Sequence, residues 1–161
     1  MERGHLIRAT LAGLATLVTL GAAASAAAAT GVHWGVLETG ATTPSGAQQP
    51  VGYVAVTKTQ ERRFLGRLDP ADSAALRRLN LQYTGVVAVF LDGLPCSSKL
   101  TANNVVRTAG TVTVSLHYTR PPVGVAMCVR TSTPYIVIGV SRKTFGRPAP
   151  TRVRIVAVAR A

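Results

Sequence analysis

The sequence contains few of the residues that carry most enzymatic chemistry. Its 161 residues include 2 cysteines, 3 histidines and 6 acidic residues, against 18 lysines and arginines. After residue 29 the histidines are His33 and His117, and their spacing groups them with neither cysteine, whereas a zinc site needs three or four such ligands. The chain also has no G-x-S-x-G nucleophile elbow and no glycine-rich phosphate loop. We therefore predict no catalytic site, no bound metal and no small-molecule cofactor.

Carboxylates are too few and too scattered to suggest a pair for acid–base chemistry. Those after residue 29 are Glu38, Glu61, Asp69, Asp72 and Asp92. A pair for glycoside hydrolysis would have to combine Asp92 with Asp69 or Asp72. Asp69 and Asp72 are better used at the N-terminus of a helix, where negative charge is favourable.

The first 29 residues have the pattern of a secretory signal peptide. Arg3 and Arg8 give a positively charged start, an apolar stretch covers residues 11–21, and small residues follow it. We predict cleavage near Ala26–Ala29 and a secreted or extracytoplasmic protein. The alternative is an uncleaved membrane anchor, because the uncharged run over residues 9–29 could just span a bilayer.

Positive charge dominates the rest of the chain. After residue 29, 16 basic residues stand against 5 acidic ones, a surplus of 11. In an exported protein this surplus favours anionic neighbours, such as wall polymers, lipid head groups or an acidic protein face. Export argues against nucleic acid as the partner. The basic residues are scattered, with no run longer than the pairs at 62–63, 77–78 and 142–143, and scattered arginine is often a solvated surface rather than a binding stripe.

The two cysteines, Cys96 and Cys128, both lie in the part that we expect to be exported. An even number of cysteines in an oxidising compartment indicates a disulfide. A reactive thiol would have to stay free beside a base, and exposed free thiols do not last outside the cell. We predict a Cys96–Cys128 bridge, which would stabilise the domain by roughly 3 kcal/mol through closure of a loop of about 30 residues.

The hydrophobic pattern predicts an α+β, mostly β domain: an antiparallel sheet or sandwich of six to seven strands with one helix and the disulfide. Residues 30–50 are assigned to an N-terminal strand and a linker, and residues 51–161 to the β-rich domain. The linker prediction rests on the Gly-, Thr- and Pro-rich segment 39–50. The helix is expected at about 70–79, because Asp69 can cap it and a proline follows in the first turn.

Strand patterns recur along the chain, at 32–38, 51–59, 84–93, 100–108, 111–119, 133–142 and 151–160. Residues 84–93, TGVVAVFLDG, are apolar at both odd and even positions, as expected of a strand covered on two faces. Residues 100–119 are expected to form a hairpin around the turn Ala109-Gly110.

The second hairpin strand alternates cleanly between apolar and polar residues. The residues predicted to point inward are Val112, Val114, Leu116 and Tyr118. Thr113, Ser115 and His117 then share the outer face. A nucleophile beside a base is one interpretation of this ladder, so a small secreted hydrolase with its site near His117 is the alternative function. A solvated sheet face has the same appearance.

Within residues 64–143 a helix leads into LQYTGVVAVFLDG, then the hairpin LTANNVVRTAGTVTVSLHYTRPP, then TSTPYIVIGVSRK. The characteristic parts are VVAVFLDG and the Thr133-Pro134-Tyr135 entry to a strand that ends in Arg142-Lys143. This order resembles the C-terminal domain of the protease-complex subunit PrcB-like family, found in secreted bacterial proteins. The resemblance implies a non-catalytic domain, associated in some members with a secreted protease. Where such domains carry a Gly-Gly-Tyr-type segment this chain has LPCSSKLTA, with Cys96 at the turn, so the family's use of that loop is not carried over.

We expect the protein to act as an exported, non-catalytic binding domain, either a protein–protein module, protease-associated or not, or a cell-envelope module. The residues expected to contact the partner are Arg120, Tyr135, Arg142, Lys143 and Arg147. The expected partner is a secreted or envelope protein, with a protease among the candidates, or an anionic cell-envelope polymer. A basic module for anionic wall polymer or lipid is a further alternative. The loops that carry most of these residues could also simply connect strands.

Overall fold

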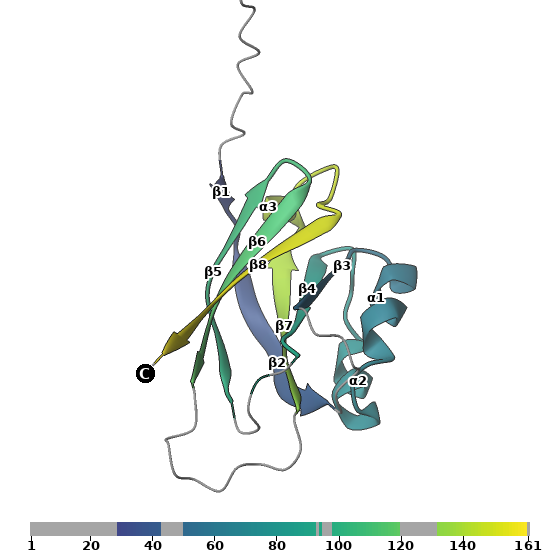
Figure 1. Cartoon of the computed structure of the whole chain (residues 1–161). Coiled ribbons are helices and arrows are strands. Elements are labelled where there is room, and N and C mark those ends of the chain that lie inside the picture. The colour runs from purple at the N-terminus through teal and green to yellow at the C-terminus, as the bar shows by residue number, and fades with distance from the viewer. Residues whose placement is uncertain (1–28, 43–49, 93, 95–97, 120–131, 161) are drawn as a thin grey trace, which may run out of the picture.

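The computed structural model describes residues 29–42, 50–92, 94, 98–119 and 132–160, which form eight strands and three helices (Figure 1). In chain order the elements are β1 Thr30–Gly31, β2 Trp34–Thr42, β3 Val51–Ala55, α1 Lys58–Leu65, α2 Pro70–Leu76, β4 Thr84–Phe90, β5 Leu100–Thr108, β6 Thr111–Thr119, β7 Thr133–Ser141, α3 Arg142–Phe145 and β8 Arg152–Arg160. Of the described residues, 56% lie in strands and 17% in helices, so the expectation of a mostly β protein is confirmed.

The strands form two four-stranded sheets, with the orders β1-β5-β6-β8 and β2-β7-β4-β3. The predicted hairpin is confirmed: β5 and β6 pair antiparallel around Ala109, whose φ is 38°. The expectation of a purely antiparallel sheet is wrong at one place, because β8 pairs with β6 in parallel. The chain leaves β6, crosses the other sheet as β7 and returns in the direction of β6, so a parallel pairing results.

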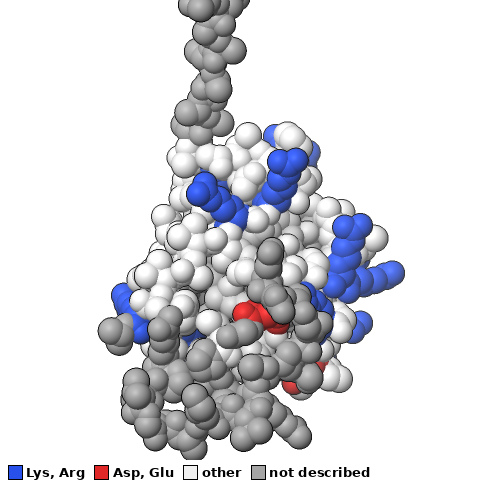
Figure 2. Space-filling view, in the orientation of Figure 1, with Lys and Arg blue, Asp and Glu red and all other residues white. Residues whose placement is uncertain are grey.

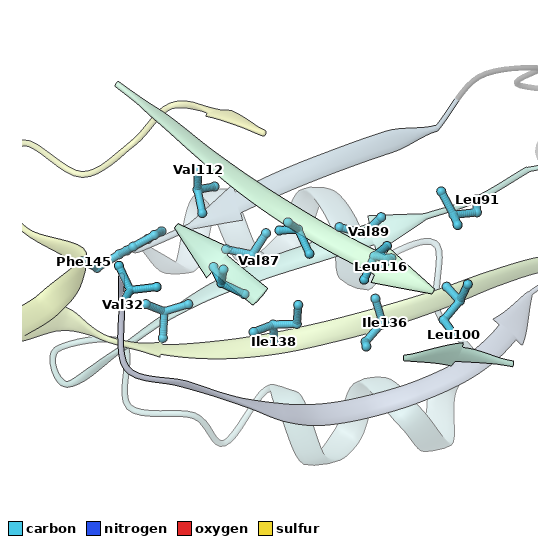
Figure 3. Packing of buried hydrophobic residues seen from close by; sticks show 13 residues of the cluster. Val32, Val87, Val89, Leu91, Leu100, Val112, Leu116, Ile136, Ile138 and Phe145 are labelled. Atoms are coloured by element: carbon cyan, nitrogen blue, oxygen red, sulfur yellow. The ribbon is translucent and has the colours of Figure 1, made fainter. Parts of the chain in front are cut away.

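The core has two layers because β4 and β7 are buried on both faces. Alternate residues of the two strands, such as Val87, Val89, Ile136 and Ile138, face the other sheet and meet side chains such as Leu116 there (Figure 3). The residues between them face α1 and α2; they are Val86, Ala88, Phe90, Tyr135 and Val137. The prediction that 84–93 contains a strand covered on two faces is therefore confirmed for β4.

The single helix expected at 70–79 is in fact α2, which ends at Leu76, and the structure adds α1 and α3. The strand expected over 51–59 ends at Ala55, and α1 begins three residues later. Its N-terminus is capped by Thr57, whose side chain accepts a hydrogen bond from the N–H of Gln60 at 3.3 Å. The loop expected from residue 39 begins later, because residues 39–42 continue β2 along β7.

Several predictions fall outside the residues that the structure describes. They concern the leader up to residue 28, both cysteines with their bridge, and Arg120. The cleavage site and the disulfide therefore stay predictions. Among the described residues, no helix has the length and apolar character needed to cross a bilayer.

Candidate functional site

A basic cleft lies where the turn after α2 meets the segment after β7. It consists of two adjoining hollows of about 740 and 550 Å³, which share Gln82, Arg142 and Arg147. The first is also lined by Lys58 and the second by Lys143. No acidic residue is among the described residues that line either hollow. We call this combined surface the basic cleft.

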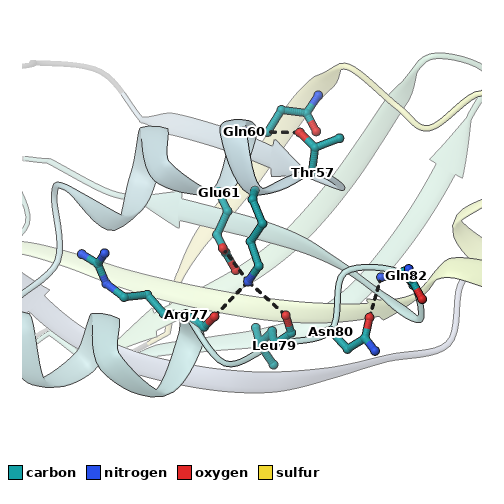
Figure 4. A network of polar contacts seen from close by, with 8 residues as sticks. Thr57, Gln60, Glu61, Arg77, Leu79, Asn80 and Gln82 are labelled. Atoms are coloured by element: carbon teal, nitrogen blue, oxygen red, sulfur yellow. Dashed lines mark hydrogen bonds and ion pairs between the residues drawn. The ribbon is translucent and has the colours of Figure 1, made fainter.

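The first wall is the turn over residues 79–83, which Asn80 shapes. The carbonyl oxygen of Asn80 accepts hydrogen bonds from the N–H groups of Tyr83 and Thr84, each at 3.1 Å. Its side-chain Oδ1 accepts another from the N–H of Gln82 at 3.0 Å (Figure 4). An asparagine side chain that bonds the backbone two residues ahead closes a tight turn, so the position of Gln82 in the cleft is fixed locally.

Lys58 fastens this wall to α1. Its ammonium donates to the carbonyl oxygens of Arg77 at 2.9 Å and Leu79 at 3.1 Å, and it lies 2.9 Å from Oε2 of Glu61 (Figure 4). The ammonium has three N–H donors, and these three acceptors account for them. Lys58 therefore positions the wall and does not offer its charge to a ligand.

The second wall is α3 and the loop that follows it. The backbone N–H of Arg142 donates to the carbonyl of Tyr83 at 2.9 Å, which joins the two walls. Beyond α3, Gly146 has φ of 76°, a region that suits glycine. A Cβ there would lie 2.4 Å from Nη1 of Arg107, and Arg107 also donates to the carbonyl of Pro148 at 2.9 Å. The loop that carries Arg147 therefore packs against the side chain of Arg107 and is hydrogen-bonded by it.

The charges available to a ligand come from three side chains. Lys143 and Arg147 are exposed, while Arg142 is partly buried. Within the described part of the chain, the buried Nη1 of Arg142 has no hydrogen-bond partner. A guanidinium donor left without a partner costs free energy. Figure 2 shows one face of the molecule, on which basic groups outnumber acidic ones.

The structure brings together three of the five residues that the sequence suggested for binding. Arg142, Lys143 and Arg147 line the basic cleft. Tyr135 does not belong there, because its side chain is fully buried between β7 and the helices. This placement corrects the expectation that Tyr135 is a contact residue on the surface.

Tyr135 has a structural environment of its own. Its hydroxyl donates a hydrogen bond to Oδ2 of Asp72 on α2. Burial, the hydrogen bond to Asp72 and the negative charge of Asp72 raise the pKa of Tyr135 well above its usual range, and Glu38 and Asp69 add to the effect. The phenol therefore stays neutral and holds α2 on the sheet.

A second group of polar side chains, around Arg67, forms its hydrogen bonds and ion pair within the group. The guanidinium of Arg67 lies 4.6 Å from the centre of the Phe90 ring and donates to the hydroxyl of Tyr53 at 3.2 Å. Its Nη2 is 3.8 Å from Oδ2 of Asp92, whose other oxygen accepts a hydrogen bond from Thr133. These groups neutralise one another, so the cluster offers less to a ligand than the basic cleft.

His117, the residue of the alternative hydrolase function, lies on the outer face of β6. Its imidazole is hydrogen-bonded to the side-chain amide of Asn103, at 2.8 Å from Nδ1 and 2.9 Å from Nε2. Ser115 precedes it on the same strand, with Val156 and Val158 as the facing residues of β8. A base for hydrolysis is oriented by a carboxylate in the Ser-His-acid arrangement, and the partner of His117 here is an amide.

Sequence reasoning missed the first wall of the cleft. Gln82 and Tyr83 stand in the segment LQYT, which has the appearance of an ordinary connection. The one available signal was Asn80, a residue typical of turns, which stands directly before the segment LQYT.

No family model matches the chain, and neither a curated protein nor a solved structure does. The resemblance to the PrcB-like family therefore stays a prediction.

Proposed function

We propose that the protein is a non-catalytic binding domain that holds an acidic protein partner through the basic cleft. The observation that carries the proposal is the grouping of Arg142, Lys143 and Arg147 around a hollow without acidic lining. Arginine is suited to carboxylates because its planar fork can donate two parallel hydrogen bonds. Export through the leader and a bridge between Cys96 and Cys128 belong to the same proposal.

The walls of the cleft support a binding role because they are held in place before any ligand arrives. Lys58, Asn80 and Arg107 fix the two sides by hydrogen bonds that do not use the three charged side chains available to a ligand. A site that is already ordered loses less conformational entropy on binding.

The proposal can be tested with a fluorescein-labelled peptide of eight glutamates and the full chain. The double variant Arg142→Gln, Arg147→Gln should raise the Kd by about tenfold or more, because charge-assisted hydrogen bonds are lost. Fluorescence anisotropy at two salt concentrations gives the Kd, which should rise with salt.

The matched control is Arg62→Gln, Arg63→Gln. It also removes two positive charges, but from exposed positions on α1 that do not line the cleft. It should change the Kd by less than about twofold. An equal loss in both double variants would mean that the peptide responds to net charge alone, and the proposal would fail. Tighter binding of long-chain polyphosphate than of the peptide, lost in the cleft variant, would instead identify an anionic polymer as the partner.

A further inference from the structure

A partly apolar hollow adjoins the basic cleft. It has a volume of about 340 Å³ and lies on the end of the β2–β7–β4 face. Leu37 and Tyr83 contribute apolar side chains to its lining, whereas Trp34 and Val36 pair with Val140 and Ile138 and face the other sheet. Tyr83 also lines the basic cleft, as does Ser141, so the two sites share a boundary.

The hollow exists because two glycines face it and the helices do not cover it. Gly35 would place a Cβ in open space, with no atom within 4 Å. A Cβ on Gly139 of the neighbouring strand would lie 3.1 Å from the side chain of Leu37, which covers that position. α1 and α2 pack on Val86, Ala88, Phe90, Tyr135 and Val137, which leaves this end uncovered.

The apolar side chains around the hollow are unusually exposed. Tyr83 is 73% exposed and Leu37 38%. Contiguous apolar surface beside polar groups is typical of an interaction site. A second copy of this chain is a poor occupant, because a net charge of +12 makes like molecules repel.

We infer that the partner presents a bulky apolar side chain directly beside an acidic one. The apolar side chain enters the hollow over Gly35, beside Leu37 and Tyr83, and the carboxylate reaches Arg142 and Arg147 across Tyr83. Charge complementarity and the shared boundary select this occupant. The inference rests on the proposed function and adds the composition of the segment that is recognised.

The test uses three labelled hexapeptides with blocked ends and the full chain. The first contains glutamate followed by phenylalanine, the second has alanine in place of phenylalanine, and the third has glutamine in place of glutamate. The first should bind about tenfold more tightly than the second, because burial of an aromatic side chain is favourable. It should also bind more tightly than the third.

The variant Gly35→Val adds a side chain where a Cβ would meet no atom within 4 Å, and valine suits a strand. It should abolish the advantage of the phenylalanine peptide over the alanine peptide and leave binding of the octaglutamate peptide unchanged. Gly31→Val is the matched control, since Gly31 also has open space around it and lies in the other sheet. Tyr83→Ala, at an exposed wall position, gives a second test if Gly35→Val does not fold.

The two hypotheses fail in different ways. If the phenylalanine and alanine peptides bind equally to the natural chain, or if Gly35→Val and Tyr83→Ala both keep the preference, the inference is overturned. Octaglutamate binding that still depends on Arg142 and Arg147 would in that case leave the proposed function standing. If the Kd of the octaglutamate peptide does not change when Arg142 and Arg147 are replaced, the proposed function and the inference are both refuted.

Discussion

At the residue scale, Tyr135 shows how burial and a charged partner set the state of one side chain. The phenol is enclosed by the sheet and the helices, and its hydroxyl donates a hydrogen bond to the carboxylate of Asp72. Both the low polarity around the ring and the nearby carboxylate disfavour the phenolate, so the pKa of Tyr135 lies above its usual value near 10. The hydrogen bond between them joins α2 to β7.

The raised pKa of Tyr135 predicts a loss of stability in alkali. The unfolded chain releases this proton near pH 10 while the folded chain keeps it. The contribution is therefore complete below pH 10 and falls as the pH rises further, by up to about 1.4 kcal/mol per pH unit. Urea unfolding at pH 8 to 11 should show the natural chain losing stability faster than Tyr135→Phe.

The same variant should be less stable than the natural chain by about 2 kcal/mol at pH 8, because Asp72 loses the hydrogen bond to its carboxylate. The gap between the two proteins should then narrow above pH 10. A gap that stays constant to pH 11 would contradict the role given to the Tyr135 proton.

The burial of Tyr135 was open to sequence reasoning. Residues 134–140, PYIVIGV, are apolar at both parities, the same signal that correctly predicted a doubly covered strand over 84–93. In contrast, Arg142 and Gln82 are 60 positions apart, and no local sequence pattern predicts that they line the same hollow.

At the scale of elements, α1 is held by tertiary contacts that its own composition does not reveal. Its sequence, KTQERRFL, places only Phe64 and Leu65 as large apolar residues, both in the last turn. That spacing shows no helical period, which is why the sequence did not predict the helix. In the folded protein these two residues are buried in the core, and Lys58, which also pairs with Glu61, bonds the carbonyls that follow α2.

Lys58→Ala should lower the free energy of unfolding by about 1 to 3 kcal/mol, since it leaves the buried Glu61 without its cation. Adding Glu61→Gln to that variant should restore part of the loss, because the unpaired charge is then removed. Urea unfolding measures both. Lys99→Ala, at an exposed position, is the control and should stay within about 0.5 kcal/mol of the natural chain. A double variant less stable than Lys58→Ala alone would count against the role of the pair.

At the scale of the whole molecule, one doubly covered sheet separates two cores. The first core lies between the sheets and the second lies under α1 and α2. The sheets also meet at an edge, where a Cβ on Gly52 would lie 2.5 Å from Val153 of β8. Cys96 and Cys128 follow β4 and precede β7, the two strands that both cores share. A bridge between them would join the segment that follows β4 in the sequence to the segment that precedes β7.

We expect thiol labelling of the denatured, unreduced protein to tag neither cysteine, and labelling after reduction to tag both. Reduction should lower the free energy of unfolding by roughly 3 kcal/mol. The variant Cys96→Ser, Cys128→Ser should show the same loss and no further response to a reducing agent. Two reactive thiols in the undenatured, unreduced protein would refute the bridge.

The sequence by itself determined where most strands run, which residues of β4 and β6 are buried, and that the chain is strongly basic. Alternation of apolar side chains is a local property, so it can be read without knowing what covers each face. Only the tertiary structure decided that β8 lies parallel to β6, and that Arg142 and Arg147 meet the turn after Asn80. These outcomes depend on which distant segments pack together, and the energies that choose among pairings belong to contacts between segments rather than to either segment alone.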